Sequence, residues 1–265
     1  MNADALAATD EVLLAEDGPI ATITLNRPAA RNAMNRAMYR LLRALFEALN
    51  ERADIRVVVL TGAGDKAFAA GADIAEFASL RTEADVLAYE QEVEGMLDAL
   101  ERLAKPVIAK IRGVATGGGC SLAAACDLRI AADDAQVGIP IARTLGNCLP
   151  LGNLSRLVDL IGPAHAKALL FTGRLLSAQE ALAAGFLTEV TRPDDLDRRV
   201  DALARELAGH APRTLQATKE GIRRLAAARR AVDGRDLLFF CYLSEDFREG
   251  VRAFLEKRRP VWTGR

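Results

Sequence analysis

The stretch "GVATGGGCSLAAACD", residues Gly113 to Asp127, decides the fold, because three consecutive glycines in it lead into a run of small residues. The apolar run "KPVIAKIRGV" (105–114) before the glycines is typical of a buried strand, and the small residues after them predict a short helix. Glycine permits a close approach to the backbone, so N–H groups at this turn are available to a ligand. The structural alternative is a tight corner between helix and strand.

A second glycine turn has the same setting. The segment "GDKAFAAGADIAEF" (64–77) follows "IRVVVLTGAG" (55–64), another apolar run that predicts a buried strand. Each turn precedes an expected helix start, where backbone N–H groups lack partners. Two such turns side by side would aim one N–H each at a single oxygen, which is the arrangement of an oxyanion hole.

Other uses of the glycine run match the sequence less well. A P-loop requires Lys-Ser or Lys-Thr after the glycines, and a dinucleotide site requires the glycines in the first strand–helix unit; neither pattern is present. The segment from Gly119 to Ala123 approximates a nucleophile elbow around Ser121. However, the only histidines, His165 and His210, fall in expected helices, and no Asp-His pattern supports a hydrolase triad.

Composition sets the broad class of the protein. The chain has 265 residues, 51% of them apolar, and a formal net charge of −1, which indicates a soluble globular protein without an electrostatic case for binding nucleic acid or an anionic membrane. The acidic start of the chain does not match a signal peptide, so we expect a cytoplasmic protein. The four cysteines lack C-x-x-C spacing, so we expect reduced thiols and no metal site.

Strand and helix patterns alternate through the first two thirds of the chain. An Asp-Gly hairpin is expected in residues 11–28, and helical periodicity covers 32–51 and 82–104. Beyond Gly146 we expect almost entirely helices, one of them beginning at the capping box of Ser177 and Glu180. The sequence thus predicts an α/β core in residues 1–200 and a helical C-terminal region in residues 201–265.

Four separated motifs together carry a resemblance to a known family. They are "ITLNRPAARNAMN" (23–35), "VVVLTGAGDKAFAAGADIAEF" (57–77), "KPVIAKIRGVATGGGCSLAAACDLRIAADDAQVGIP" (105–140) and "SEDFREGVRAFLEKRRP" (244–260). In order and spacing the chain resembles the crotonase superfamily, the enoyl-CoA hydratase/isomerase family of lyases and isomerases. The resemblance implies an α/β fold, the crotonase (ClpP-like) spiral of β-β-α units, with a C-terminal helical trimerisation region. It also implies a homotrimer or dimer of trimers that acts on an acyl-CoA thioester, with coenzyme A as part of the substrate and no tightly bound cofactor.

The resemblance also assigns site residues by position. The oxyanion hole corresponds to the backbone N–H groups of Ala72 and Gly118. The expected contacts to coenzyme A are Ala70, Asp73 and Ile74 near the first turn, and Tyr242 and Lys257 near the C-terminus, with Arg258 and Arg259 as further phosphate partners. Ordinary packing is the alternative role for Tyr242.

The chain departs from the family where hydratases place their two glutamates. Those positions hold Ser121 and Ile141. A serine hydroxyl has no useful basicity near pH 7 and isoleucine transfers no proton, so the two-glutamate hydration mechanism is not available. Hydrolase, decarboxylase, dehalogenase or C–C bond chemistry remain alternatives, as does a non-catalytic acyl-CoA-binding protein.

The stretch after Ile141, "ARTLGNCLPLGNLSRL" (142–157), also differs from the family, which predicts a remodelled acyl pocket with Arg143 and Asn147 as lining residues. Arg143 is either an anion-holding group on the acyl chain or a surface residue. Cys148 is either an acid/base group or an inert buried thiol. Near the first turn, we expect Asp73 to cap a helix and Glu76 to lie in solvent, with a Glu76 that reaches the pocket as the alternative.

Overall fold

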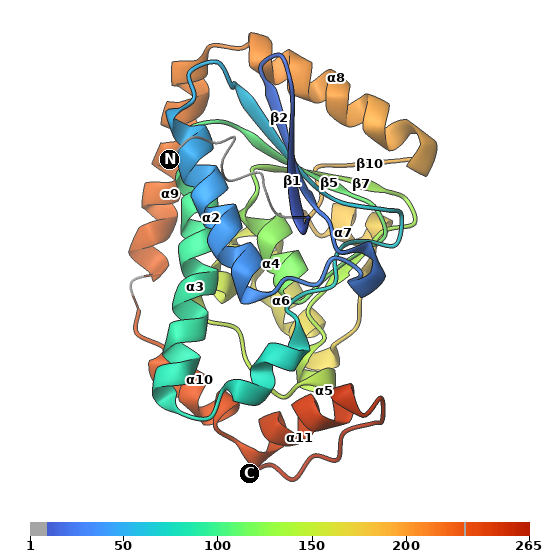
Figure 1. Ribbon diagram of the computed structural model, residues 1–265, viewed down its shortest axis with the longest axis vertical. Coiled ribbons are helices and arrows are strands. Elements are labelled where there is room, and N and C mark those ends of the chain that lie inside the picture. Colours follow the sequence, from blue (N-terminus) through green and yellow to red (C-terminus); the bar gives the residue numbers. More distant parts are fainter. Residues whose placement is uncertain (1–9, 231) are drawn as a thin grey trace.

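Two sheets form the framework of the protein in a computed structural model, which describes residues 10–230 and 232–265 (Figure 1). The larger sheet has the order β1 (Val12–Asp17), β2 (Ile20–Leu25), β3 (Val57–Gly62), β5 (Val107–Ile111), β7 (Leu128–Ala132) and β10 (Glu189–Thr191). The smaller sheet has the order β4 (Ala67–Ala69), β6 (Val114–Thr116), β8 (Gln136–Gly138) and β9 (Leu176–Ser177). Pairing is parallel throughout except at the two ends, β1 with β2 and β8 with β9.

The chain repeats one unit three times. Each repeat adds one strand to the larger sheet and one to the smaller sheet, and a helix follows. Strands β3 and β4 precede the 3₁₀ helix η2 (Ile74–Ser79) and α3 (Glu83–Arg102). Strands β5 and β6 precede α4 (Gly118–Ala125), and β7 and β8 precede α5 (Ile141–Thr144) and α6 (Leu151–Thr172). This succession is the expected spiral of β-β-α units, and the fold prediction is confirmed.

The N-terminal elements follow the sequence patterns closely. Strands β1 and β2 pair across the Asp17-Gly18 turn, where Gly18 has a φ of 57°. After the 3₁₀ turn η1 (Pro28–Ala30), helix α2 (Arg36–Glu51) runs beside α3 (Figure 1). Its buried face consists of Met38, Tyr39, Leu42, Leu45, Phe46 and Leu49. Each such side chain stabilises the fold by about 1.5–3 kcal/mol through removal of apolar surface from water.

Helix α8 (Leu196–Gly209) covers one face of the larger sheet. Its buried residues Leu196, Val200 and Ala204 pack in a cluster with strand residues that include Val57 and Ile108. Residue 200, where we expect the core to end, therefore lies inside a helix that packs on the sheet, and the division into two regions stays a prediction. Three helices follow: α9 (Pro212–Arg230), α10 (Arg235–Tyr242) and α11 (Glu245–Leu255).

The region beyond Gly146 corrects one expectation and confirms another. It is not almost entirely helical, because β9 and β10 extend the two sheets there, and the 3₁₀ turn η3 (Pro193–Asp195) follows β10. The run "TEVT" that contains β10 is too short to show strand periodicity. The capping box is confirmed, since Ser177 and Glu180 bond reciprocally at the start of α7 (Ala178–Ala183).

Two further expectations concern membranes and the N-terminus. Across the part of the chain that the structure describes, none of the helices combines the length and apolar character needed to cross a membrane. The expected absence of a signal peptide concerns the start of the chain, of which residues 1–9 lie outside the described residues.

Helix α4 packs against β4 at the closest backbone contact near the glycine run. A Cβ added to Gly119 would overlap the carbonyl oxygen of Ala69 and lie 2.8 Å from its carbonyl carbon. A Cβ added to Gly118 would meet its nearest neighbour at 3.6 Å, an ordinary van der Waals distance. Gly118 therefore has room for a methyl side chain, and Gly119 does not.

We therefore predict opposite tolerance at two adjacent positions. Gly119→Ala should lower the free energy of unfolding by about 1–3 kcal/mol or more, because α4 must move away from β4. The matched variant Gly118→Ala should change it by less than about 1 kcal/mol. Urea denaturation monitored by circular dichroism measures both, and equal losses in the two variants would contradict the packing argument.

Candidate active site formed by two backbone turns

The first turn, Ala70 to Asp73, leaves the carboxyl end of β4 and is held from one side by the segment 31–34. The N–H of Ala70 donates to Arg31 O at 2.9 Å, and the N–H of Asp73 donates to Met34 O at 2.8 Å. Met34 N–H donates to Gly71 O at 2.8 Å, which completes a parallel bridge between Met34 and Ala72. Because alternate amides of an extended segment point to opposite sides, the N–H of Ala72 points away from this support.

The second turn, Gly117 and Gly118, leaves the carboxyl end of β6. Gly117 has φ 54° and ψ −123°, a conformation that favours glycine. Its N–H donates to Gly138 O at 2.9 Å, and its carbonyl accepts from Ser121 N–H at 3.1 Å as α4 begins. Gly118 is the first residue of α4, so its N–H has no partner within the helix.

The two turns lie against each other because β4 and β6 are neighbouring parallel strands. A Cβ added to Gly118 would lie 3.6 Å from the amide nitrogen of Ala72, and one added to Gly71 would lie 3.4 Å from the amide nitrogen of Gly118. Neither of these N–H groups has a hydrogen-bond partner among residues 10–230 and 232–265, and both residues are only half-buried. The turns thus offer two adjacent, accessible donors to an oxygen atom.

Three of the residues expected to contact coenzyme A, namely Ala70, Asp73 and Ile74, lie at the first turn. Asp73 Oδ2 accepts hydrogen bonds from both terminal nitrogens of Arg27 at 3.0 Å. Its Oδ1 accepts from Ala75 N–H at 3.3 Å and caps η2, as expected for a capping residue. Ala70 and Ile74 are half-buried beside it. Their contacts to coenzyme A stay predictions.

Glu76 differs from its expected place in solvent. It is half-buried, and its two carboxylate oxygens accept from the backbone N–H of Arg36 at 3.1 and 3.0 Å. This N–H belongs to the first residue of α2, where a negative charge is favourable because the helix dipole places partial positive charge there. The expectation of a solvated carboxylate was therefore wrong.

Ser121 and Ile141, the residues at the two positions that the resemblance assigns to the hydratase glutamates, are not carboxylates. Ser121 lies in the first turn of α4 and is 5% exposed, and the half-buried Ile141 begins α5. Ile141 packs against the main hydrophobic core. Neither side chain supplies a base for proton transfer.

A buried carboxyl group that sequence reasoning missed lies on α3. Glu90 is 8% exposed and accepts the hydroxyl proton of Tyr242 at 2.5 Å. Tyr242 also accepts from the Asn147 side-chain amide at 3.1 Å, and the buried Asn147 Oδ1 has no partner among the described residues. The signal was available, because Glu90 lies between Val86 and Val93 on the apolar face of the helix pattern.

Tyr242 is thus a packing residue in this conformation. It is 2% exposed, and its ring contacts Phe77 and Phe247 at centroid distances of 6.3 and 4.8 Å. Burial, with Glu90 beside it, raises the pKa of Tyr242 well above its usual range. The structure leaves no surface of Tyr242 for coenzyme A, in line with the packing alternative, whereas Lys257 is exposed just after α11 with a φ of 55°.

Cys148 is half-buried and engaged with α10. Its thiol donates to Leu237 O at 3.3 Å, and the thiol of Cys241 lies nearby. The Cys241 thiol and then burial raise the pKa of Cys148, and the Cys148 thiol lowers that of Cys241. Cys148 is therefore a weak candidate for an acid/base group near neutral pH.

Arg143 is exposed and lines a cavity of about 470 Å³ near the C-terminus. The other residues around this cavity include Phe254, Arg258, Arg259 and Trp262. Arg143 thus lies with basic and aromatic side chains of the C-terminal segment, and its contact to the acyl chain stays a prediction.

The buried Glu90 gives a pH-dependent prediction. Burial raises the pKa of Glu90 from 4.5 to about 7, so the folded state prefers the protonated carboxyl. The protonated Glu90 contributes fully to the free energy of unfolding below about pH 4.5. This contribution is lost as the pH rises through 7, and the free energy of unfolding falls by about 3 kcal/mol in total. Glu90→Gln should remove this loss, measured as the free energy of unfolding in urea from pH 4 to 8.

A control on the same helix has the opposite sign. Arg36 lowers the pKa of Glu92 through a side-chain hydrogen bond, so the contribution of Glu92 is lost only as the pH falls below about 4.5. The free energy of unfolding of Glu92→Gln should therefore change with pH in the same way as that of the unmodified protein from pH 5 to 8. If the free energy of unfolding of Glu90→Gln also changed with pH as in the unmodified protein over this range, the prediction of a raised pKa for Glu90 would be contradicted.

Comparison with known proteins identifies the family. The family model described as enoyl-CoA hydratase/isomerase matches residues 15–265. The chain is 38% identical to a putative enoyl-CoA hydratase/isomerase, YngF, of Bacillus subtilis, over 92% of this chain and 95% of the relative. It is 36% identical to the 2,3-dehydroadipyl-CoA hydratase of Escherichia coli, over 96% of this chain and 99% of the relative.

A solved structure agrees with these matches. Methylmalonyl-CoA decarboxylase in complex with 2-nitronate-propionyl-CoA is similar with a TM-score of 0.87 and 28% identity, over 97% of this chain and 100% of that structure. The motifs, the two adjacent turns and the similarity over nearly the whole chain agree: the protein belongs to the enoyl-CoA hydratase/isomerase family of the crotonase superfamily.

Proposed function

We propose that the protein is an enzyme that binds an acyl-CoA thioester and stabilises its enolate with the N–H groups of Ala72 and Gly118. The observation that carries the proposal is the adjacency of these two donors, which have no hydrogen-bond partner within the described residues. Coenzyme A enters as part of the substrate, and we propose no tightly bound cofactor.

The proposed chemistry follows from where charge develops. A thioester oxygen gains negative charge when its α-carbon loses a proton or CO₂ and keeps the bonding electron pair, or when its β-carbon is attacked by a nucleophile. Donors fixed by the fold stabilise that charge without reorganising during the reaction, and removal of one such donor typically costs 10²–10³ in rate. With Ser121 and Ile141 at the glutamate positions, we do not propose hydration by a pair of carboxylates.

Decarboxylation is a second candidate, supported by the similarity to methylmalonyl-CoA decarboxylase at a TM-score of 0.87. In that reaction the bond between the α-carbon and a carboxylate breaks, CO₂ leaves, and the electron pair forms the thioester enolate. A proton then adds to the α-carbon. This sequence needs an oxyanion hole and a proton donor but no carboxylate base, which suits the residues at positions 121 and 141.

Two of the proteins named above point to acyl groups that carry a carboxylate. The names 2,3-dehydroadipyl-CoA hydratase and methylmalonyl-CoA decarboxylase both denote thioesters of dicarboxylic acids. We therefore include carboxylated acyl groups in the proposed substrate class.

We also propose a homotrimer or a dimer of trimers in the cytoplasm, with no nucleic-acid or membrane partner. Large apolar side chains are exposed along α9 and α10, namely Ile222, Leu225, Leu237 and Phe240. Exposed apolar surface on this scale supports contact with further copies of the chain. The four unpaired cysteines suit a reducing compartment.

Three measurements on one preparation test the function. Calorimetry with acetyl-CoA should detect binding. Turnover of crotonyl-CoA, followed by loss of the enoyl-thioester absorbance, should be weak or absent, because carboxylate acid/base catalysis contributes about 10²–10⁴ in rate. Release of CO₂ from methylmalonyl-CoA tests decarboxylation. Binding without any turnover would favour the non-catalytic alternative, and no binding would overturn the proposal.

A single substitution tests the oxyanion donor. Gly118→Pro removes the N–H, and proline is favourable at the first position of a helix. The turnover number for the substrate identified above should fall by about 10²–10³ relative to Gly118→Ala, which retains the N–H and adds the same Cβ. Equal turnover in the two variants would exclude Gly118 as a donor in the reaction.

A further inference from the structure

Two of the four cysteines lie close together where the remodelled stretch meets α10. Cys148 belongs to residues 145–150, which connect α5 to α6 in irregular conformation, and Cys241 is in the last turn of α10. The Cys148 thiol donates to Leu237 O at 3.3 Å. Residues 237 and 241 lie one turn apart on the same helix face, and side chains of a helix lean toward its N-terminus. The thiols of Cys148 and Cys241 therefore share one surface of α10.

The adjacent residues hold the same two segments together. Asn147 precedes Cys148, and its side-chain amide donates at 3.1 Å to the hydroxyl of Tyr242, which follows Cys241. Tyr242 in turn donates to Glu90 on α3 and is 2% exposed. Each of the two thiols also shifts the pKa of the other, as neighbouring groups do. Two consecutive residues of the stretch thus face two consecutive residues of α10.

The other two cysteines have a different environment. Cys120 and Cys126 are 1% and 4% exposed, and burial raises the pKa of each thiol to about 12. Both are therefore protonated at neutral pH and shielded from reagents. Cys148 and Cys241 are only half-buried, and the Cys148 thiol lowers the pKa of Cys241 to about 7. Cys241 is thus the cysteine with the most thiolate at neutral pH, and we expect it to react first.

We propose that Cys148 and Cys241 form a reversible disulfide that fastens α10 to the stretch after α5, as a redox-sensitive lock on the C-terminal helices. The oxidant is a small-molecule disulfide of the glutathione class. Disulfides that form in a reducing compartment are usually transient and serve catalysis or redox sensing. The inference goes beyond the proposed function and does not depend on which reaction the protein catalyses.

The bond forms by two exchange steps. The Cys241 thiolate attacks one sulfur of the small disulfide and displaces a small thiolate, which leaves a mixed disulfide on Cys241. The Cys148 thiol then loses its proton, and its sulfur attacks Cys241 Sγ and displaces the second small thiolate. In total the two protein thiols lose two electrons and two protons, and the small disulfide is reduced to two thiols. The raised pKa of Cys148 is due first to Cys241, and the mixed disulfide abolishes this effect because Cys241 then carries no negative charge.

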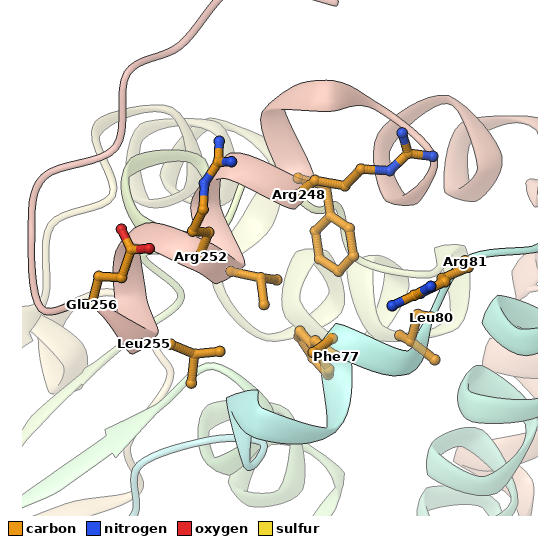
Figure 2. Close-up of a pocket in the computed structure, with 10 residues that line it drawn as sticks. Phe77, Leu80, Arg81, Arg248, Arg252, Leu255 and Glu256 are labelled. Atoms are coloured by element: carbon orange, nitrogen blue, oxygen red, sulfur yellow. The ribbon is translucent and has the colours of Figure 1, made fainter.

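The redox-sensitive lock acts on the contact between the C-terminal helices and η2. The Phe77 ring contacts the rings of Tyr242 and Phe247 at centroid distances of 6.3 and 5.8 Å. Figure 2 shows Phe77 on η2 facing α11, and a cavity of about 510 Å³ lies between these two elements. Because η2 begins directly after the first backbone turn, a bond that restrains α10 also restrains the elements beside that turn. Cys148 and Cys241 are 93 residues apart, so the bond also reduces the conformational entropy of the unfolded chain.

Oxidation of the purified protein with glutathione disulfide tests the inference. The intact mass should fall by that of two hydrogen atoms. Peptide mapping without reductant should join the peptides that contain Cys148 and Cys241 and find Cys120 and Cys126 as free thiols. The melting temperature should rise by about 5–15 °C and return to its first value after dithiothreitol is added. Hydrogen exchange at the backbone amides of α10 should slow in the oxidised protein.

Three variants assign these effects to the pair. Cys148→Ser and Cys241→Ser each remove one partner, and each should abolish both the mass loss and the rise in melting temperature. Cys126→Ser is the matched control, because it removes a thiol outside the pair and should retain both effects.

Three results would overturn the inference. A glutathione adduct that persists on Cys241 in the unmodified protein would show that the Cys148 sulfur does not reach it. A disulfide between two copies of the chain, seen on a non-reducing gel, would assign the reactive thiol to a contact between subunits. Formation of the bond within one chain without any rise in melting temperature or slowing of exchange would show that it does not restrain α10.

Discussion

The parallel pairing of β4 with β6 is the constraint on which the candidate site depends. Because both strands run in the same direction, the turns that leave their carboxyl ends meet at one edge of the smaller sheet. Each turn is then fixed from its far side, the first by hydrogen bonds to segment 31–34 and the second by Gly138. What remains at the centre is one N–H from each turn. The contact of Gly119 with Ala69 sets how closely α4, and with it Gly118, approaches the first turn.

This construction separates charge stabilisation from proton transfer. The backbone supplies the donors, and their geometry does not depend on any side chain at positions 72 or 118. The resemblance implies that the family's acid/base groups are side chains, and the positions that it assigns to them hold Ser121 and Ile141 here. A reaction that forms an enolate without a carboxylate base would use the two backbone N–H donors and would not need the two glutamates. Methylmalonyl-CoA decarboxylase, the solved structure named above, is similar to this chain with a TM-score of 0.87.

The C-terminal helices complete the region around the turns. Helix α11 packs along η2, and α10 buries Tyr242 against Glu90 on α3. Helix α11 therefore covers η2, and α10 closes a polar cluster at positions 90, 147 and 242. Since the remodelled stretch after Ile141 supplies Asn147 and Cys148 to these contacts, the departure from the family pattern and the docking of α10 are parts of one packing arrangement.

The resemblance to the family predicted the spiral of β-β-α units, and sequence patterns predicted the Asp-Gly hairpin, the capping box at Ser177 and the two glycine turns. These features depend on local periodicity, on turn chemistry and on motifs whose order is visible in the chain. The strands β9 and β10 escaped prediction because they are too short for periodicity and form only by pairing with strands made earlier in the chain.

The tertiary structure alone decided the environment of individual side chains. Glu76 accepts from a helix N-terminus, and Tyr242 turns inward to Glu90, which lies 152 residues away in the sequence. A sequence specifies which groups are present and their local conformation. Burial and pairing depend on which distant elements pack together, and they determine the pKa of a carboxyl group such as that of Glu90.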